Sequence, residues 1–189
     1  MFSLQKFQAR DIPNLISILR MFMTIPVVWA LLLERFDIAL VLFAVAGFSD
    51  GLDGFLAKHF SWESRMGGIL DPLADKLLLV SCFFSLGWLG LVPYWLVAVI
   101  LFRDLLIVAG ATAYHFQVSR LDAEPSLISK LNTCVQILLV LVVVLDEGFV
   151  DLPQELLVGL IWVTFATTAL SGVGYVWVWS RRAALNSDS

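Results

Sequence analysis

Long apolar runs separated by short polar stretches dominate the pattern along this chain. Each run is close to the ~20 residues that an α-helix needs to cross a bilayer. The pattern predicts an all-α fold, an integral membrane bundle of six transmembrane helices at residues 12–33, 38–58, 68–90, 93–115, 127–146 and 154–179. None of the stretches between them is long enough to separate domains, so we expect a single membrane domain over residues 1–189.

Polar and small residues recur at intervals of three and four inside the first three spans. Residues at this spacing share one helix face, and small residues let helices approach closely in lipid. They are Asn14, Ser17, Met21 and Thr24 in the first span, Ala39, Ala46, Asp50, Asp53 and Ala57 in the second, and Gly67, Asp71 and Asp75 in the third. We expect the face of the first span to point inward. In the third span, Pro72 fits only if the regular helix starts just before it.

Composition supports the membrane assignment, and the placement of charge predicts the orientation. Hydrophobic residues make up 60% of the chain and charged residues 15%, against about 45–50% and 25% in soluble domains. With the N-terminus inside, the outer loops hold Arg35 alone among basic residues, and the inner side receives Lys6, Arg10, Lys58, Arg65, Arg120, Lys130, Arg181 and Arg182. Because basic residues favour the cytoplasmic side, both termini are expected to be cytoplasmic.

The strongest chemical signal is a group of four aspartates, Asp50, Asp53, Asp71 and Asp75, within 26 residues. A carboxylate at the bilayer centre costs at least ~2.5–3.5 kcal/mol on insertion scales. Divalent cations bound by oxygen ligands would allow all four to stay ionised. In the expected topology, the four lie at one depth, at the cytoplasmic ends of two adjacent spans.

This group suits two Mg²⁺ or Mn²⁺ ions with open positions for phosphate oxygens. Gly54 and Gly67 would let a nucleotide or a facing helix approach the backbone. A single aspartate could be a structural hydrogen-bonding group, and two could form a proton relay. A cation or proton transporter would need carboxylates spread across the bilayer, and a catalytically silent scaffold would not need all four.

The aspartates and glycines resemble the signature of the CDP-alcohol phosphotransferase family, DxxDGxxARx₈GxxxDxxxD. The matching positions are Asp50, Asp53, Gly54, Ala57, Gly67, Asp71 and Asp75, with the eight-residue spacer intact. One position departs, because Lys58 stands where the family usually has arginine. Lysine keeps the charge but lacks the planar fork that makes two-pronged contacts.

The resemblance implies a transferase of phospholipid biosynthesis, in which an acceptor hydroxyl attacks the phosphorus of a CDP-linked lipid and CMP leaves. It implies that Asp50, Asp53, Asp71 and Asp75 hold two metal ions and that Asp75 is also the general base. Local reasoning leaves open which aspartate is the base. Gly54, Ala57, Lys58 and Gly67 are the positions expected to bind the CDP-lipid.

Two basic residues outside the signature are further candidates for phosphate binding. Arg103 lies inside the fourth span, and its alternative is an internal ion pair with Asp104 or a signature aspartate. Lys130 opens the fifth span, and its alternative is a positive-inside anchor. The stretches around Arg103 and at residues 125–136 are similar to those of CMP-forming, eukaryotic-type cardiolipin synthases.

The related phosphatidylglycerophosphate synthases share most of this plan. The expected substrates are therefore CDP-diacylglycerol and an acceptor, phosphatidylglycerol first and glycerol 3-phosphate as the alternative. The resemblance places the chain in a bacterial or mitochondrial inner membrane, among membrane lipids. The charge placement above predicts that the site faces the cytoplasm. The resemblance also implies a homodimer, and no nucleic-acid partner is expected.

Overall fold

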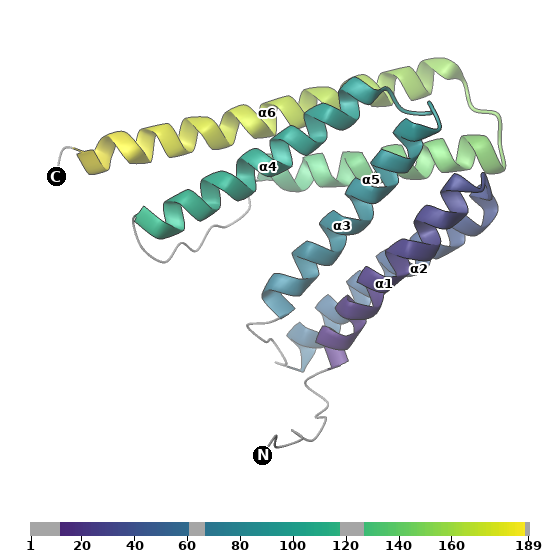
Figure 1. The fold of residues 1–189 in the computed structure, drawn as a ribbon, viewed down its shortest axis with the longest axis horizontal. Coiled ribbons are helices and arrows are strands. Elements are labelled where there is room, and N and C mark those ends of the chain that lie inside the picture. Colours follow the sequence, from purple (N-terminus) through teal and green to yellow (C-terminus); the bar gives the residue numbers. More distant parts are fainter. Residues whose placement is uncertain (1–11, 61–66, 118–126, 188–189) are drawn as a thin grey trace. The chain divides into compact units, whose positions relative to one another are not determined.

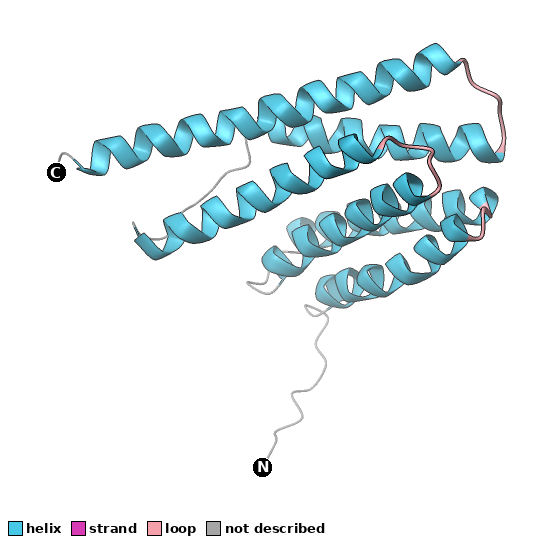
Figure 2. Cartoon of the chain, turned by 45° about the horizontal axis from the view of Figure 1, so that its top comes forward, coloured by secondary structure: helices cyan, strands magenta, loops and turns pink. Residues whose placement is uncertain are grey.

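The computed structural model describes residues 12–60, 67–117 and 127–187, and these residues form six helices (Figure 1). The helices are α1 (Ile12–Leu32), α2 (Phe36–His59), α3 (Gly67–Trp88), α4 (Tyr94–Gln117), α5 (Leu127–Gly148) and α6 (Gln154–Ser187). Within these ranges the chain forms helices and loops and no strand (Figure 2). The all-α expectation is confirmed for the described residues.

The helix bounds follow the apolar runs closely, with two informative differences. α6 continues to Ser187, eight residues beyond the predicted end, because a helix can extend past the apolar run that identifies it. α3 starts at Gly67, five residues before Pro72, so the expectation that the helix begins just before this proline is wrong. Proline lacks an N–H group, so the helix loses one hydrogen bond in its second turn.

Three of the helices are long and apolar enough to cross a membrane by length and composition, at Asn14–Leu32, Leu127–Gly148 and Gln154–Tyr175. The described parts of the other three do not meet that measure, and they carry Asp50, Asp71, Asp75 and Arg103. The chain is therefore a helical membrane protein.

Residue contacts divide the chain into two compact units. The first unit contains α1, α2, α3 up to Leu86, and residues 147–149. The second unit contains residues 87–146, with α4 and most of α5, and residues 150–189, with α6. Each unit is described by itself.

A tight reversal places α1 beside α2 in the first unit (Figure 1). The backbone N–H of Arg35 donates to the carbonyl of Ala30 at 2.9 Å, and that of Glu34 donates to Leu31 at 2.9 Å. Glu34 has a φ of 55°, the left-handed conformation that ends many helices in this way. Ala39 and Ala46 on α2 are fully buried, which confirms this part of the predicted small-residue stripe.

In the second unit, α4 lies beside α6 (Figure 1). The indole ring of Trp95 on α4 contacts Trp162 and Phe165 on α6, with ring centroids 5.6 and 5.5 Å away. Farther along, this unit buries polar residues from three helices, among them Arg103, Asn132 and Thr168. Of the charged residues expected from the sequence, Asp50, Asp71 and Asp75 thus lie in the first unit, and Arg103 lies in the second.

Candidate active site

Two buried residues of α1 connect three of the signature aspartates, one from α2 and two from α3. Arg20 Nη1 donates to Asp50 Oδ1 at 2.5 Å and also to Asp75 Oδ1. Ser17 Oγ donates to Asp71 Oδ1. Ser17 and Arg20 are three residues apart and therefore share one face of α1. We call these five residues the aspartate site.

The aspartate site places one positive charge between two negative ones. The side chain of Arg20 is only 1% exposed, whereas those of Asp50 and Asp75 are 43% and 40% exposed. A buried guanidinium needs ionised partners, because an unpaired buried charge is strongly disfavoured. The two carboxylates supply this compensation, and their exposed surfaces remain accessible to a ligand.

The residues of this site fit a divalent cation by their chemistry. Asp50 and Asp75 come from different helices yet converge on one cationic group, and carboxylate oxygens are the ligands that Mg²⁺ prefers. Among the described side chains, no three histidine, cysteine, aspartate or glutamate residues are grouped as a metal site. The side chain of Asp53 lies outside the described residues, so the four-aspartate ligand set stays a prediction.

The other signature positions lie close to the site aspartates along the sequence. On α2, a Cβ atom added to Gly54 would meet no described protein atom within 4 Å, so space for a ligand is open there. Gly67 is buried at the first residue of α3. Ala57 and Lys58 belong to α2, but their side chains lie outside the described residues. Their expected contact with the CDP-lipid stays a prediction.

Arg103 forms a separate polar cluster in the second unit. Its Nη1 donates to Asp104 Oδ1 at 2.8 Å, and its Nη2 donates to Ser129 Oγ at 2.7 Å and to Ser171 Oγ at 2.5 Å. The ion pair between Arg103 and Asp104, which the sequence left as an alternative, is thus present. Serines from α5 and α6 accept the remaining hydrogen bonds of the guanidinium. Because Arg103 is 6% exposed, the pair is desolvated and links three helices.

Asn132 and Lys130 on α5 differ in burial. Asn132 is fully buried, and its Oδ1 accepts hydrogen bonds from Thr168 Oγ1 at 2.8 Å and Thr167 Oγ1 at 3.1 Å. Lys130, two residues earlier, is exposed near the start of α5. Its proposed contact with phosphate and its alternative as a membrane anchor are both compatible with this position.

Sequence reasoning missed Arg20 and gave Ser17 no role in the site. The sequence does indicate a functional role for Arg20, because an arginine inside a predicted membrane span is a candidate functional residue. It also lies three residues after Ser17 and four before Thr24, on the inward face already identified.

Comparison with known proteins agrees with the signature. The sequence model of the CDP-alcohol phosphatidyltransferase family matches residues 10–170. The chain is 35% identical to the cardiolipin synthase (CMP-forming) of Rattus norvegicus and to that of Homo sapiens, over 87% of this chain and 60% of each relative. It is 33% identical to the chloroplastic CDP-diacylglycerol--glycerol-3-phosphate 3-phosphatidyltransferase 1 of Oryza sativa subsp. japonica, over 87% of this chain and 56% of the relative.

The chain therefore spans about 60% of the length of the two animal relatives. The family model matches α1 to α5 and the first half of α6. The match includes the aspartate site and, from the Arg103 cluster, Arg103, Asp104 and Ser129, whereas Ser171 lies one residue beyond it. The chain belongs to the CDP-alcohol phosphatidyltransferase family.

Proposed function

We propose that this protein is a membrane enzyme that transfers a phosphatidyl group from CDP-diacylglycerol to an alcohol acceptor and releases CMP. The observation that carries the proposal is the convergence of Asp50, Asp71 and Asp75 on Ser17 and Arg20. Aspartates from two helices gather there beside α1, and carboxylate oxygens are ligands for the divalent ions that many phosphoryl-transfer enzymes use. The family match supports the same reaction.

Four aspartates, Asp50, Asp53, Asp71 and Asp75, would hold two Mg²⁺ or Mn²⁺ ions. The family generally depends on divalent metals. When bound, such ions supply positive charge that neutralises the diphosphate and the departing CMP. Arg20 holds Asp50 and Asp75 together, so the ligands are oriented before substrate arrives.

Asp75 is the proposed general base. A bond forms between the acceptor oxygen and the phosphorus of the phosphatidyl group, while the bond from that phosphorus to the oxygen of CMP breaks. CMP leaves with the electron pair, and the acceptor proton goes to a carboxylate oxygen of Asp75. Arg20 orients this carboxylate through its hydrogen bond to Oδ1.

The distribution of the aspartates supports transfer over cation transport. Asp50 and Asp53 lie in the C-terminal half of α2, and Asp71 and Asp75 lie in the N-terminal half of α3. A transport path would need acidic groups at successive depths, whereas these residues belong to the two helix ends that flank residues 60–66.

The proposed arrangement in the membrane has six spans in a single domain, with both termini and the aspartate site on the cytoplasmic side. α2, α3 and α4 are 24, 22 and 24 residues long, which is sufficient to cross the hydrocarbon core. Asp50, Asp75 and Arg103 are paired with opposite charges, which lowers the cost of placing them there. The basic residues described above set the orientation.

The acceptor that we propose is phosphatidylglycerol, which would give cardiolipin. The support is the similarity to the two animal cardiolipin synthases. The alternative acceptor is glycerol 3-phosphate, which would give phosphatidylglycerophosphate. It is supported by the rice relative, whose identity to this chain is almost the same.

An assay of purified protein with CDP-diacylglycerol, Mg²⁺ and either acceptor tests both the transfer reaction and the choice of acceptor. We expect CMP release with phosphatidylglycerol and cardiolipin as the lipid product. Phosphatidylglycerophosphate formed only with glycerol 3-phosphate would show that the acceptor is wrong and the transfer reaction right. No CMP release with any alcohol acceptor would contradict the transfer reaction.

A further inference from the structure

The contacts of α1 with the aspartate site engage one oxygen of each carboxylate. Ser17 Oγ donates to Asp71 Oδ1, and Arg20 Nη1 donates to Oδ1 of both Asp50 and Asp75. Among the described residues, each of these hydrogen bonds from α1 ends on Oδ1, so the second carboxylate oxygen, Oδ2, is not the one that α1 holds. The helix thus gives each aspartate one oxygen bound to protein and one oxygen available to a ligand.

The hydroxyl of Ser17 differs in its partner from other hydroxyls on the helices of the first unit. Those of Thr24, Ser49 and Ser85 donate to the carbonyl one turn earlier in their own helix, at 3.4, 2.8 and 2.8 Å, which is a common bond for a helical hydroxyl. Ser17 is fully buried, and its hydroxyl reaches Asp71, 54 residues away on another helix. This hydroxyl therefore acts on a carboxylate of the site.

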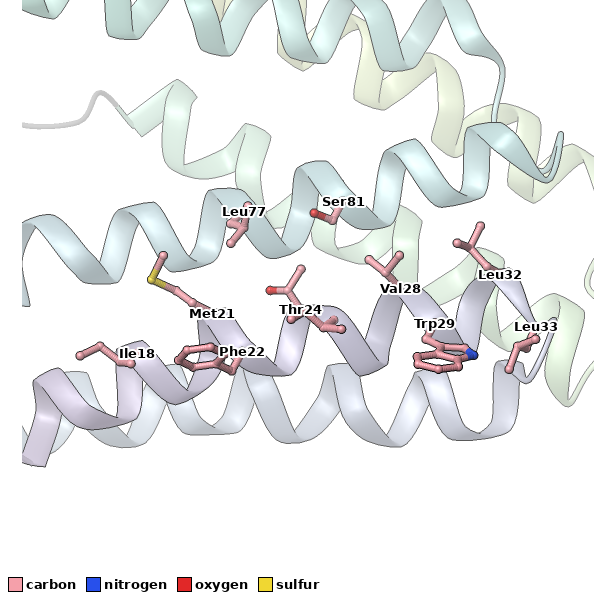
Figure 3. A pocket seen from close by; sticks show the side chains of 11 residues that line it. Ile18, Met21, Phe22, Thr24, Val28, Trp29, Leu32, Leu33, Leu77 and Ser81 are labelled. Atoms are coloured by element: carbon pink, nitrogen blue, oxygen red, sulfur yellow. The ribbon is translucent and has the colours of Figure 1, made fainter.

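The adjoining part of α1 has different neighbours. It lines an apolar groove of about 950 Å³, with Ile18 and Met21 on α1 and Leu77 and Ser81 on α3 among the lining residues (Figure 3). None of the five residues of the aspartate site belongs to this lining. A change at Ser17 therefore alters a contact of the site and leaves the lining of the groove intact.

Holding one oxygen of a carboxylate affects which cation the carboxylate binds best. Ca²⁺ takes six to eight oxygen ligands in flexible geometry and accepts carboxylates that give both oxygens, whereas the smaller Mg²⁺ requires a nearly ideal octahedron. The two oxygens of one carboxylate lie too close together to occupy two corners of a regular octahedron. A hydrogen bond to Oδ1 opposes the two-oxygen mode and so disfavours the larger ion.

We propose that Ser17 is a positioning residue that selects Mg²⁺ or Mn²⁺ against Ca²⁺ by holding Oδ1 of Asp71, an inference that rests on the proposed function. Arg20 holds Asp50 and Asp75 in the same way. Hydrogen-bond partners of metal ligands typically change metal affinity by about 10- to 100-fold. Ser17 is the more informative residue to change, because its hydroxyl can be removed without removing a charge.

The selectivity can be measured without turnover, by electron paramagnetic resonance of Mn²⁺ bound to the purified protein in detergent. Displacement of Mn²⁺ by Mg²⁺ and by Ca²⁺ gives the two dissociation constants. We expect Ser17→Ala to lower the ratio Kd(Ca²⁺)/Kd(Mg²⁺) about tenfold, and Ser17→Thr, which keeps the hydroxyl, to retain the wild-type ratio. Ser85→Ala is the matched control and should also retain it, because it removes a buried hydroxyl that donates within α3.

Two further measurements complete the experiment. In the assay of CMP release with Mg²⁺, Ca²⁺ should inhibit Ser17→Ala at a concentration about tenfold lower than for the wild type. Size-exclusion chromatography checks folding. If the added methyl group of Ser17→Thr prevents folding, Ser17→Cys takes its place, and its weaker donor should give a ratio between those of Ser17→Ala and the wild type.

The outcomes separate this inference from the transfer reaction. An unchanged ratio in Ser17→Ala, or equal losses of affinity for Mg²⁺ and Ca²⁺, would overturn the proposed selection while leaving the transfer reaction intact. Mn²⁺ binding to the wild type that Asp71→Asn does not weaken would place the ions elsewhere. That result would overturn the inference together with the proposed metal site.

Discussion

Arg20 on α1 and Asp50 on α2 are joined by a hydrogen-bonded ion pair of 2.5 Å between Nη1 and Oδ1. The same Nη1 atom contacts Asp75 on α3. One buried guanidinium therefore joins the three helices that carry the candidate active site. It also sits between carboxylates that would otherwise repel one another.

Arg20→Gln should destabilise the protein and make its stability more dependent on metal. Glutamine removes the shared positive charge, so Asp50 and Asp75 lose their compensation. We expect a loss on the order of 1–3 kcal/mol in the free energy of unfolding without divalent ions. Mg²⁺ should then raise the apparent Tm in detergent more for the variant than for the wild type, because a bound cation can replace the guanidinium.

Arg35→Gln is the control for this measurement. Arg35 forms an exposed pair with Asp37 at 3.3 Å, and such pairs contribute little to stability. Its apparent Tm and its response to Mg²⁺ should match the wild type. Identical Mg²⁺ responses for Arg20→Gln and the wild type would argue against a shared cation site at Asp50 and Asp75.

Arg103→Ala separates substrate binding from internal pairing. If Arg103 binds phosphate, the KM for the acceptor or the CDP-lipid should rise by roughly 10- to 150-fold, the loss of about 1.5–3 kcal/mol from a charge-assisted hydrogen bond. The change also leaves Asp104 without its cationic partner, which lowers stability. The double variant Arg103→Ala, Asp104→Ala should regain part of the lost stability. Its KM should stay as high as that of Arg103→Ala. An unchanged KM for both substrates would leave Arg103 with a structural role only.

Cysteine labelling in intact cells tests the orientation. Asp151 is exposed in the loop between α5 and α6, so Asp151→Cys should react with a membrane-impermeant reagent. It is a better outer probe than Asp146, whose Oδ1 accepts a hydrogen bond from the backbone of Leu152 at 2.7 Å. Ser61→Cys lies outside the described residues, in the expected cytoplasmic loop, and should react only after the membrane is permeabilised. The reverse pattern would place the aspartate site on the wrong side for cytoplasmic CDP-lipid.

The helices could be predicted from the sequence because membrane helices are defined by long apolar runs. The start of α1 at residue 12 and of α5 at residue 127 agree with the expected spans, and α2 begins two residues early. The end of α6 could not be placed, because the apolar run ends before Arg181 and Arg182 and helix formation beyond them does not depend on burial in lipid. Hydropathy identifies the apolar run and not the hydrogen-bonded helix.

The site was predictable in part. Spacing alone brought Asp71 and Asp75 to one helix face, and the contacts of both with α1 agree with that. Arg20 was missed because the first span was treated as an apolar run, and its one cation was not assigned a partner. Nor could spacing show that Ser171 of α6 would meet Arg103, since contacts between distant helices depend on packing.

The central claim is that the aspartate site carries out metal-dependent phosphatidyl transfer. The most direct measurement is the rate of CMP release from CDP-diacylglycerol for Asp50→Asn, Asp53→Asn, Asp71→Asn and Asp75→Asn, each with and without a chelator. Asp37→Asn serves as the matched control, because Asp37 is exposed at the opposite end of α2. We predict that chelation abolishes turnover and that each site variant loses a factor of about 100 or more, while Asp37→Asn keeps wild-type activity. Near-normal, chelator-resistant turnover in Asp71→Asn or Asp75→Asn would contradict the claim.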